Sequence, residues 1–388
     1  MTFLCAFYSQ AFLMTTRFEI QMPHWPPANW AELPDDGVME RMLTLLEGLG
    51  NPQLQLPPVV HVAGTNGKGS TIAFLRAMLE AAGYNVHAYT SPHIRSFAER
   101  ITVAGKQVED KALHMALEAC RSANEERPIR FFEGTTAAAF LLFSQTPADI
   151  LLLETGMGGQ NDPTNVLEEV RLSIITSISE DHMEYLGDTI EKITSHKAGI
   201  IKNECPVVFG FQSPQVMELL EKSAEIHQSP ALVYGKHWAV QKAPDGFIYA
   251  DGHGQINLPE PALKGPHQLL NAGAAIAALS VLDEFEILGD HIAAGLKWVQ
   301  WPGRLEHMES SALPHGWELW FDGGHNMAAG HMLAVMAEEE WSDKPLYVIF
   351  GTTRGKEVAT MLQPLAPIAE EMIAVPVAAE PKCYTPLE

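Results

Sequence analysis

One glycine-rich segment carries the residues best suited to chemistry. It reads Gly64-Thr65-Asn66-Gly67-Lys68-Gly69-Ser70 and lies between an apolar run and a helical pattern. Glycines let backbone amides approach phosphate oxygens, the lysine supplies positive charge, and the N-terminus of the following helix adds its dipole. The segment is not a standard phosphate-binding motif, because Gly69 separates Lys68 from its hydroxyl. A turn that only links strand to helix is the alternative, and the lysine argues against it.

Strand and helix patterns alternate around this loop. The run 59–63 predicts a strand, and 70–82 predicts a helix that ends at Gly83. Further strands are predicted at 85–90, 150–153 and 172–178, and a helix at 274–282. The continuous apolar run 150–153 is typical of a strand that is covered on both faces. This rhythm predicts an α/β fold with a mainly parallel sheet.

A second set of elements begins late in the chain. Strands are predicted at 317–321, 346–350 and 372–375, with helices after Asn326 and Lys356. The preceding Trp301-Pro302-Gly303 is typical of a hinge, so we expect a domain boundary near residue 308. The expected parts are an extension over 1–36, a domain over 37–307 and a C-terminal α/β domain over 308–388. That last domain is small for a doubly wound fold, and it stops where another helix and strand should follow.

Composition narrows the classes of function. The 388 residues are 46% apolar and 19% charged, which is typical of a globular protein with two domains. A formal net charge of −23 argues against nucleic acid or an anionic membrane as a partner. The cysteines form no Cys-x-x-Cys pair, and we interpret them as reduced structural thiols in the cytosol without a zinc site. They are Cys5, Cys120, Cys205 and Cys383.

The first fourteen residues are unusually apolar. They lack a basic segment and are too few to cross a bilayer, so neither a signal peptide nor an anchor is favoured. We interpret them as a non-native or mis-started extension, because Met14 and Met22 could each be a start.

Several ordered blocks resemble a known family. The run from His61 to Thr71 is similar to the nucleotide loop of the folate branch of the Mur ligase superfamily, which also has a glycine after the lysine. Downstream blocks match in the same order, from about residue 37 to the C-terminus. They are Tyr89-Thr90-Ser91-Pro92-His93, Glu99-Arg100-Ile101, Glu154-Thr155-Gly156-Met157-Gly158-Gly159, Asp181-His182, Lys197-Ala198-Gly199-Ile200, Pro302-Gly303-Arg304 and Asp322-Gly323-Gly324-His325-Asn326.

The resemblance implies a fold and an activity. The fold is a P-loop domain like that of Mur ligases plus a smaller, Rossmann-like C-terminal domain. The activity is that of dihydrofolate synthase/folylpolyglutamate synthase: ATP phosphorylates a carboxylate, and the amine of L-glutamate displaces the phosphate. The implied partners are ATP, Mg²⁺, L-glutamate and dihydropteroate or a reduced folate. The resemblance also implies a cytoplasmic monomer.

Resemblance assigns the metal ligands. Ser91, Glu154 and His182 are expected to bind Mg²⁺, and Lys197 to be carbamylated so that its anionic form approaches a second ion. Lys68, Lys197 and His182 are the expected catalytic residues. Considered singly, Glu154, His182 and Lys197 each have an ordinary structural interpretation. Glu154 would be a solvated strand end, His182 a core or surface histidine, and Lys197 an exposed helix lysine.

Resemblance also assigns the nucleotide contacts. Thr65, Asn66, Gly67, Lys68, Gly69 and Ser70 are expected at the phosphates, with Asn271 and Arg304 as further ATP contacts. Asp322 and His325 are expected near the ribose and adenine. Arg304 lies beside the predicted hinge, so domain closure would bring it onto the phosphates.

The folate pocket is expected near Gly37–Arg41, Ser91–Arg100 and the block Phe131-Phe132-Glu133. Aromatic rings there could stack a pterin, although core packing is the commoner role of phenylalanine.

Three features depart from the family pattern. Gln160 replaces a usual arginine, His196 replaces a usual glutamate, and 351–356 lacks the usual acidic pattern. These differences leave open a paralogue that binds nucleotide or folate without catalysis. A cell-wall Mur ligase is disfavoured by Gly69, and a generic P-loop NTPase explains none of the later blocks.

Overall fold

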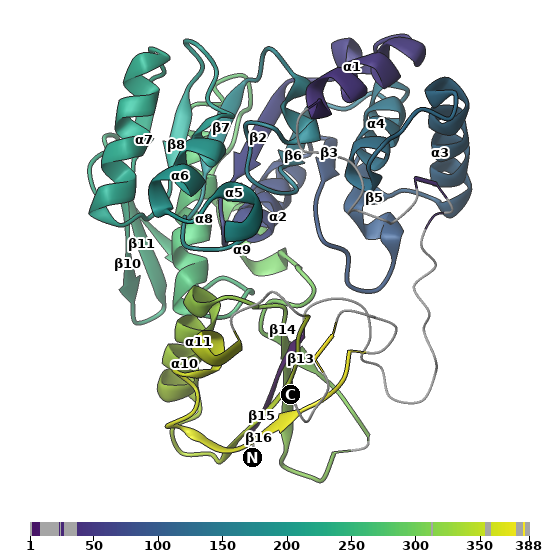
Figure 1. Cartoon of the computed structure of the whole chain (residues 1–388). Helices are drawn as coiled ribbons and strands as arrows, with labels where there is room; N and C mark the ends of the chain where they lie inside the picture. Colours follow the sequence, from purple (N-terminus) through teal and green to yellow (C-terminus); the bar gives the residue numbers. More distant parts are fainter. Residues whose placement is uncertain are drawn as a thin grey trace. The chain divides into compact units, whose positions relative to one another are not determined.

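Two compact units make up the chain. A computed structural model describes residues 2–7, 23, 25–26, 37–311, 313–353, 358–377 and 383–384, with the backbone alone at 2–7 (Figure 1). The central unit comprises residues 21–260 and 270–299, and the C-terminal unit comprises 1–20, 261–269 and 300–388. We expected a boundary near residue 308 and a separate extension over 1–36. The structure instead divides the chain at 300 and assigns two earlier segments to the C-terminal unit.

An eight-stranded sheet forms the framework of the central unit. Its order is β5-β4-β3-β6-β2-β7-β8-β9, and only the pairings of β4 with β3 and with β5 are antiparallel. This confirms the predicted α/β fold with a mainly parallel sheet. The strands are β2 (Val59–Ala63), β3 (Val86–Tyr89), β4 (Ile101–Val103), β5 (Lys106–Gln107), β6 (Ile150–Glu154), β7 (Leu172–Ile175), β8 (Val207–Phe209) and β9 (Ala231–Val233).

The central strand β2 is paired on both sides. Val60 pairs with Leu152 of β6 and with Leu172 of β7, and all five residues of β2 are buried. A strand that is buried on both faces is typically apolar, and the sequence Val-Val-His-Val-Ala is apolar except at His61. The strand expected at 172–178 ends three residues early, at Ile175. Residues 176–179 instead contact the glycine-rich loop at 64–70, which we call the phosphate loop.

Helices cover the sheet in two main clusters. One apolar core joins α1, α3 and α4 to the sheet, and a second joins α5, α6 and α7 to it. Helix α2 packs against β6 and β3, and α9 packs on α2. The helices are α1 (Val38–Gly48), α2 (Lys68–Ala81), α3 (Asp110–Asn124), α4 (Phe131–Ser144), α5 (Met183–Leu186), α6 (Ile190–Ala198), α7 (Pro214–Ile226), α8 (Pro266–Leu279) and α9 (Gly289–Trp298).

A small antiparallel sheet completes the central unit. Strands β10 (Trp238–Ala243), β11 (Gly246–Asp251) and β12 (Gly254–Pro259) pair in sequence order. No element was predicted for this segment. Helix α8 begins eight residues before the predicted start at 274, because its first turns are less apolar than its alanine-rich end.

A five-stranded sheet forms the C-terminal unit. Its order is β13-β14-β1-β15-β16, and only β13 is antiparallel to its neighbour. The strands are β1 (Thr2–Phe7), β13 (Glu306–Met308), β14 (Glu318–Asp322), β15 (Leu346–Gly351) and β16 (Ala369–Ala374), and the helices are α10 (Met327–Glu340) and α11 (Val358–Leu362). Leu333, Trp341 and Val348 belong to its buried core. The predicted second set matches β14, β15, β16, α10 and α11 within three residues, whereas β1 and β13 were not predicted.

Strand β1 differs from the expectation of an extension. Thr2–Phe7 lies between β14 and β15 and is parallel to both, with Leu4 opposite Trp320 and Val348. Apart from residues 2–7, 23 and 25–26, the expected extension lies outside the described residues, including Met14 and Met22.

Among the described residues, no helix is both long and apolar enough to cross a membrane. Cys120 and Cys205 are buried free thiols, and Cys383 is a partly buried one. The side chain of Cys5 lies outside the described residues.

Candidate active site

The phosphate loop joins the C-terminal end of β2 to the first turn of α2. The amides of Thr65 and Asn66 both donate to the Ser177 carbonyl, at 2.8 and 3.2 Å. The Thr65 hydroxyl donates to the carbonyl of Ser179 and accepts from its amide. The loop is therefore fixed to the segment after β7, and the N-terminus of α2 lies at its end, where backbone amides favour an anion.

Two glycines of the loop are required by close contacts. Gly64 has φ 154°, and a Cβ there would lie 1.8 Å from the Thr176 hydroxyl. Gly67, with φ 90°, caps α2, and a Cβ there would lie 2.3 Å from Asn271 Oδ1. Asn271 therefore lies against the loop, although 204 residues separate it from Gly67. Of the other predicted phosphate contacts, Gly69 and Ser70 are buried in the first turn of α2.

Lys68 and Glu154 face each other beside the loop. Lys68 Nζ donates to the carbonyls of Gly64 and Thr65, at 3.1 and 3.3 Å, and lies 4.0 Å from Glu154 Oε1. Glu154 ends strand β6, is only 2% exposed, and accepts a 2.9 Å hydrogen bond from the Ser91 amide at its other oxygen. Ser91, Lys68 and Glu154 therefore meet at the carboxyl ends of strands β3, β2 and β6. Proteins with α/β folds bind their ligands at this end of the sheet.

Lys197 approaches the same loop from α6. It is 4% exposed, and its Nζ donates to the Gly64 carbonyl at 2.8 Å. Burial, together with the neighbouring Lys68 ammonium, lowers the pKa of Lys197 to about 7, although Asp181 and Asp162 act in the opposite direction. A neutral amine is therefore accessible at this position near neutral pH, which an exposed lysine does not offer.

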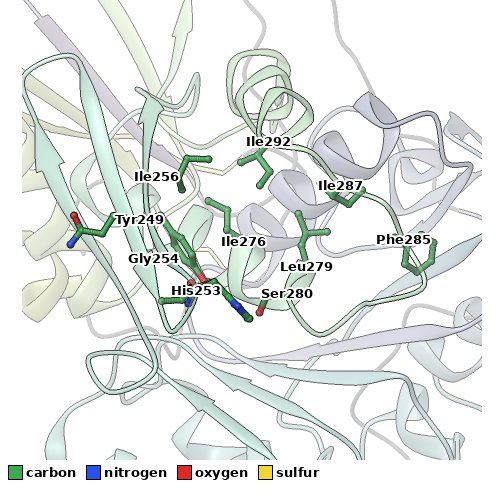
Figure 2. Close-up of a pocket in the computed structure, with 12 residues that line it drawn as sticks. Tyr249, His253, Gly254, Ile256, Ile276, Leu279, Ser280, Phe285, Ile287 and Ile292 are labelled. Atoms are coloured by element: carbon green, nitrogen blue, oxygen red, sulfur yellow. Dashed lines mark hydrogen bonds between the residues drawn. The ribbon is translucent and has the colours of Figure 1, made fainter.

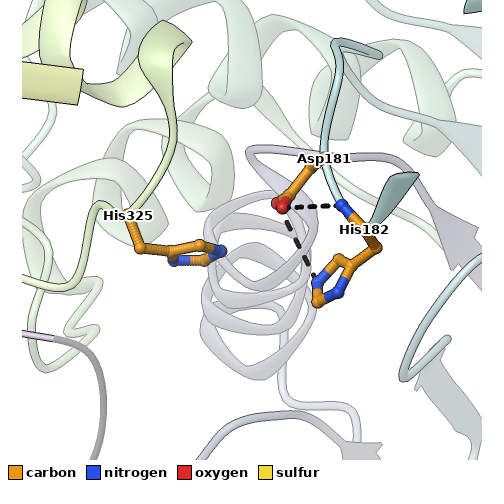
Figure 3. A group of neighbouring side chains, drawn as sticks. All are labelled: Asp181, His182 and His325. Atoms are coloured by element: carbon orange, nitrogen blue, oxygen red, sulfur yellow. Dashed lines mark hydrogen bonds and ion pairs between the residues drawn. The ribbon is translucent and has the colours of Figure 1, made fainter. Parts of the chain in front are cut away.

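His182 is held by its neighbour Asp181. The Asp181 carboxylate accepts the His182 amide at 2.9 Å and lies 3.9 Å from its Nε2, as Figure 3 shows. His182 has φ 53° and caps α5, so the backbone turns sharply there. Because Asp181 also acts on the pKa of Lys197, the pair lies near enough to share the electrostatics of the loop.

The loop that follows Glu154 and β6 packs against α6, the helix that carries Lys197. The Gln160 amide donates to the His196 carbonyl at 2.7 Å, and a Cβ on Gly199 would lie 2.5 Å from that of Gln160. The contact between the two segments uses backbone atoms and glycines. The two departures from the family pattern, Gln160 and His196, therefore meet each other here.

The sequence did not predict a buried series of hydrogen bonds that joins Asp162, Thr164 and His61. Asp162 accepts the amide of Met157 and both the amide and hydroxyl of Thr164, and the Thr164 oxygen lies 2.8 Å from His61 Nε2. Burial and nearby Lys202 lower the pKa of His61 to about 3, so the ring is neutral. Asp before Pro163 is a helix-capping pattern, and this signal could have pointed to Asp162.

Arg304, Asp322 and His325 belong to the C-terminal unit. Asp322 is 3% exposed and accepts the amides of Leu305 and Gly324, at 2.9 and 2.7 Å. Burial raises its pKa, while Arg304 lowers it. Arg304 donates to the Gly303 carbonyl, and the His325 ring lies 3.2 Å from that of Gly323. Asp322 therefore holds together the two segments that carry Arg304 and His325.

The residues of the expected folate pocket are packed and paired. Arg41 and the fully buried Glu133 form an ion pair at 2.6 Å. The rings of Phe132 and Tyr89 lie 5.7 Å apart, and Phe131 contacts Phe97. These contacts bring the three expected segments together in one part of the central unit.

The chain is similar to known proteins over most of its length. Residues 62–279 match the model of the Mur ligase middle domain. The dihydrofolate synthase/folylpolyglutamate synthase of Bacillus subtilis (strain 168) is 35% identical over 346 residues, which is 85% of this chain and 78% of that protein. The folylpolyglutamate synthase of Lacticaseibacillus casei is 34% identical over 369 residues, 91% of this chain and 84% of that protein.

A solved structure shows the same similarity in three dimensions. Escherichia coli FolC in complex with DHPP and ADP has a TM-score of 0.81 and 30% identity, and the match covers 90% of this chain and 81% of that one. Sequence and fold therefore agree over most of both chains. The chain belongs to the Mur ligase family, in its dihydrofolate synthase/folylpolyglutamate synthase branch.

Proposed function

We propose that the chain is an ATP-dependent ligase that adds L-glutamate to dihydropteroate, to the γ-carboxyl group of reduced folates, or to both. The observation that carries this proposal is that Lys68 and Lys197 both donate to the carbonyl of Gly64, with Glu154 facing Lys68. Relatives with this family's ligase names cover most of the chain, and one solved relative holds ADP with DHPP. The enzyme is a ligase that forms carbon–nitrogen bonds.

The reaction needs the loop to neutralise and position phosphate. The γ-phosphoryl group passes from ATP to the substrate carboxylate, and the amine of glutamate then attacks the acyl phosphate, releasing phosphate. Lys68 and the amides at the start of α2 stabilise the charge of the transferred group. Thr65, Asn66, Gly67, Gly69, Ser70 and Asn271 bind the phosphates. In the C-terminal unit Arg304 is a further ATP contact, with Asp322 and His325 for the ribose and adenine.

The residues proposed as metal ligands offer donor atoms that fit Mg²⁺. The Glu154 carboxylate and the Ser91 hydroxyl supply hard oxygen atoms, and His182 adds an imidazole nitrogen. Glu154 is buried at a strand end between the Ser91 amide and Lys68, so its orientation is fixed. These three residues would hold the ion, which would neutralise the phosphates. We further propose a second ion beside a carbamylated Lys197, for which the lowered pKa of this amine is favourable.

We also propose that the protein is a cytoplasmic monomer.

Phosphate release by the purified chain tests the function, with ATP, Mg²⁺ and glutamate, comparing dihydropteroate with tetrahydrofolate. Release that depends on glutamate and on either acceptor is the expected result. ADP binding without any such release would identify a catalytically impaired paralogue instead.

A further inference from the structure

A second pocket lies in the central unit, between the small antiparallel sheet and helices α8 and α9. Figure 2 shows its walls, and its volume is about 310 Å³. That is at the lower end of the range of small-molecule sites in proteins. It shares no lining residue with the phosphate loop, and none of its residues is used by the proposed reaction.

The floor of this pocket is apolar and its rim is polar. Ile276 and Leu279 of α8 and Phe285 after it are buried, and Ile292 of α9 faces them across the pocket (Figure 2). The rim carries exposed polar residues such as Ser280. A ligand with an apolar body would gain free energy by covering this floor.

Two polar groups give the pocket a chemical preference. Tyr249 is 4% exposed, and its buried hydroxyl lies beside the Asp251 carboxylate. Asp251 lines the same pocket, with one carboxylate oxygen accepting the His253 amide at 2.8 Å. Burial raises the pKa of Tyr249, and the adjacent Asp251 carboxylate raises it further. The described lining contains His253 but no lysine or arginine.

We propose that this pocket binds a small organic cation of the aryl-alkyl ammonium class. The aromatic ring covers the isoleucine, leucine and phenylalanine floor. The ammonium group donates one hydrogen bond to the Tyr249 oxygen and pairs with Asp251. An anion of the same size would meet the Asp251 carboxylate with no lysine or arginine to offset it. The proposal is independent of the ligase function, because no residue is shared between the two sites.

Titration of the full chain with 2-phenylethylamine, observed by ligand NMR at neutral pH and low salt, tests this site. Phenylacetate has nearly the same size and the opposite charge, so it controls for apolar binding alone. We expect the amine to bind at least about tenfold more tightly than phenylacetate. Equal affinities for the two would overturn the proposal.

Two variants locate the binding. Ser280→Trp places an indole over the rim and should weaken amine binding at least about tenfold, because a filled pocket excludes the ring. Ser122→Trp is the matched control: both serines are exposed, and each hydroxyl donates to a helix carbonyl. Asp251→Asn should abolish the preference for the amine over phenylacetate. If Ser280→Trp fails to fold by its thermal transition, Ile287→Trp from the pocket wall replaces it.

Saturating ADP distinguishes this site from the nucleotide loop. Amine binding should persist unchanged with ADP present, and displacement by ADP would overturn the assignment. Unaltered binding in a folded Ser280→Trp protein would overturn it as well. These experiments measure amine binding alone, so their outcomes do not depend on whether the chain has ligase activity.

Discussion

Lys68 and Lys197 donate to one and the same carbonyl oxygen, that of Gly64, at 3.1 and 2.8 Å. Burial disfavours the charge of Lys197, and the repulsion between two ammonium groups at one acceptor adds to this effect. This arrangement explains why the pKa of Lys197 is lowered to about 7. A bound anion at the loop would compensate for this concentration of positive charge.

Removing either member of the facing pair Lys68 and Glu154 should abolish most activity. Lys68→Ala leaves the phosphates without their nearest cation, and Glu154→Ala removes the buried carboxylate. We expect turnover to fall by about 10²-fold or more in each. Steady-state phosphate release measures this, with circular dichroism to show that the fold is intact. Lys111→Ala on α3 is the control, and near-normal turnover in either test variant would refute the assigned roles.

Lys197→Ala should nearly abolish glutamate ligation. If the working form is a carbamate, a small carboxylic acid added in solution should partly restore the activity by occupying the vacated anionic position. The rate of glutamate-dependent phosphate release, with and without the acid, measures this. Full activity of the variant would exclude the mechanism, whereas loss without rescue would argue for the unmodified lysine.

Stability should depend on pH through Lys197. Its amine releases its proton near pH 7 in the folded chain and near the ordinary value of 10.5 when unfolded. Between these values the unfolded state binds more protons, so stability rises with pH. Lys197→Met lacks this titration, so its advantage in free energy of unfolding should be largest near pH 7 and shrink towards pH 9. Urea unfolding in CO₂-free buffer checks this, and a constant difference would contradict the shifted pKa.

The close approach of Asn271 should make Gly67 intolerant of a side chain. Gly67→Ala adds a Cβ that would lie 2.3 Å from Asn271 Oδ1, at a left-handed φ of 90°. Gly83→Ala is a matched control, with φ 92° and no neighbour within 4 Å. Both variants carry backbone strain of about 1–2 kcal/mol, but only the first displaces the loop. Calorimetry should show ADP affinity at least about tenfold weaker in Gly67→Ala alone.

The buried chain behind the loop should contribute measurably to stability. Thr164→Val leaves His61 Nε2 and one interaction of Asp162 unsatisfied. We expect a loss of about 1–3 kcal/mol in the free energy of unfolding. In the double variant His61→Leu/Thr164→Val the loss should be smaller than the sum of the single losses, because both partners are removed together. Additive losses would show that the two residues do not interact.

Deleting residues 1–20 should weaken the C-terminal unit selectively. Strand β1 pairs with β14 on one side and β15 on the other, so its loss removes two ladders of hydrogen bonds. Hydrogen exchange should become faster in β14 and β15, while β2 of the central unit stays protected. Unchanged protection of β14 and β15 would show that β1 is dispensable for the sheet.

The sequence alone determined the local chemistry of the loop and a part of the set of elements. The run Gly64 to Ser70 identified the loop because glycine, lysine and a helix start have a physical role in one short segment. Strands β2 and β6 were predictable because a strand buried on both faces is typically apolar. Helix α10 was predictable because Asn326 caps it by accepting a hydrogen bond from the Ala329 amide.

Only the tertiary structure decided what these residues do to one another. The lowered pKa of Lys197 depends on burial and on Lys68, a residue 129 positions earlier in the chain. The contact of Asn271 with Gly67 and the place of β1 between β14 and β15 also join segments far apart in sequence. Periodicity reports only on neighbours along the chain, whereas electrostatics and packing depend on distance in space.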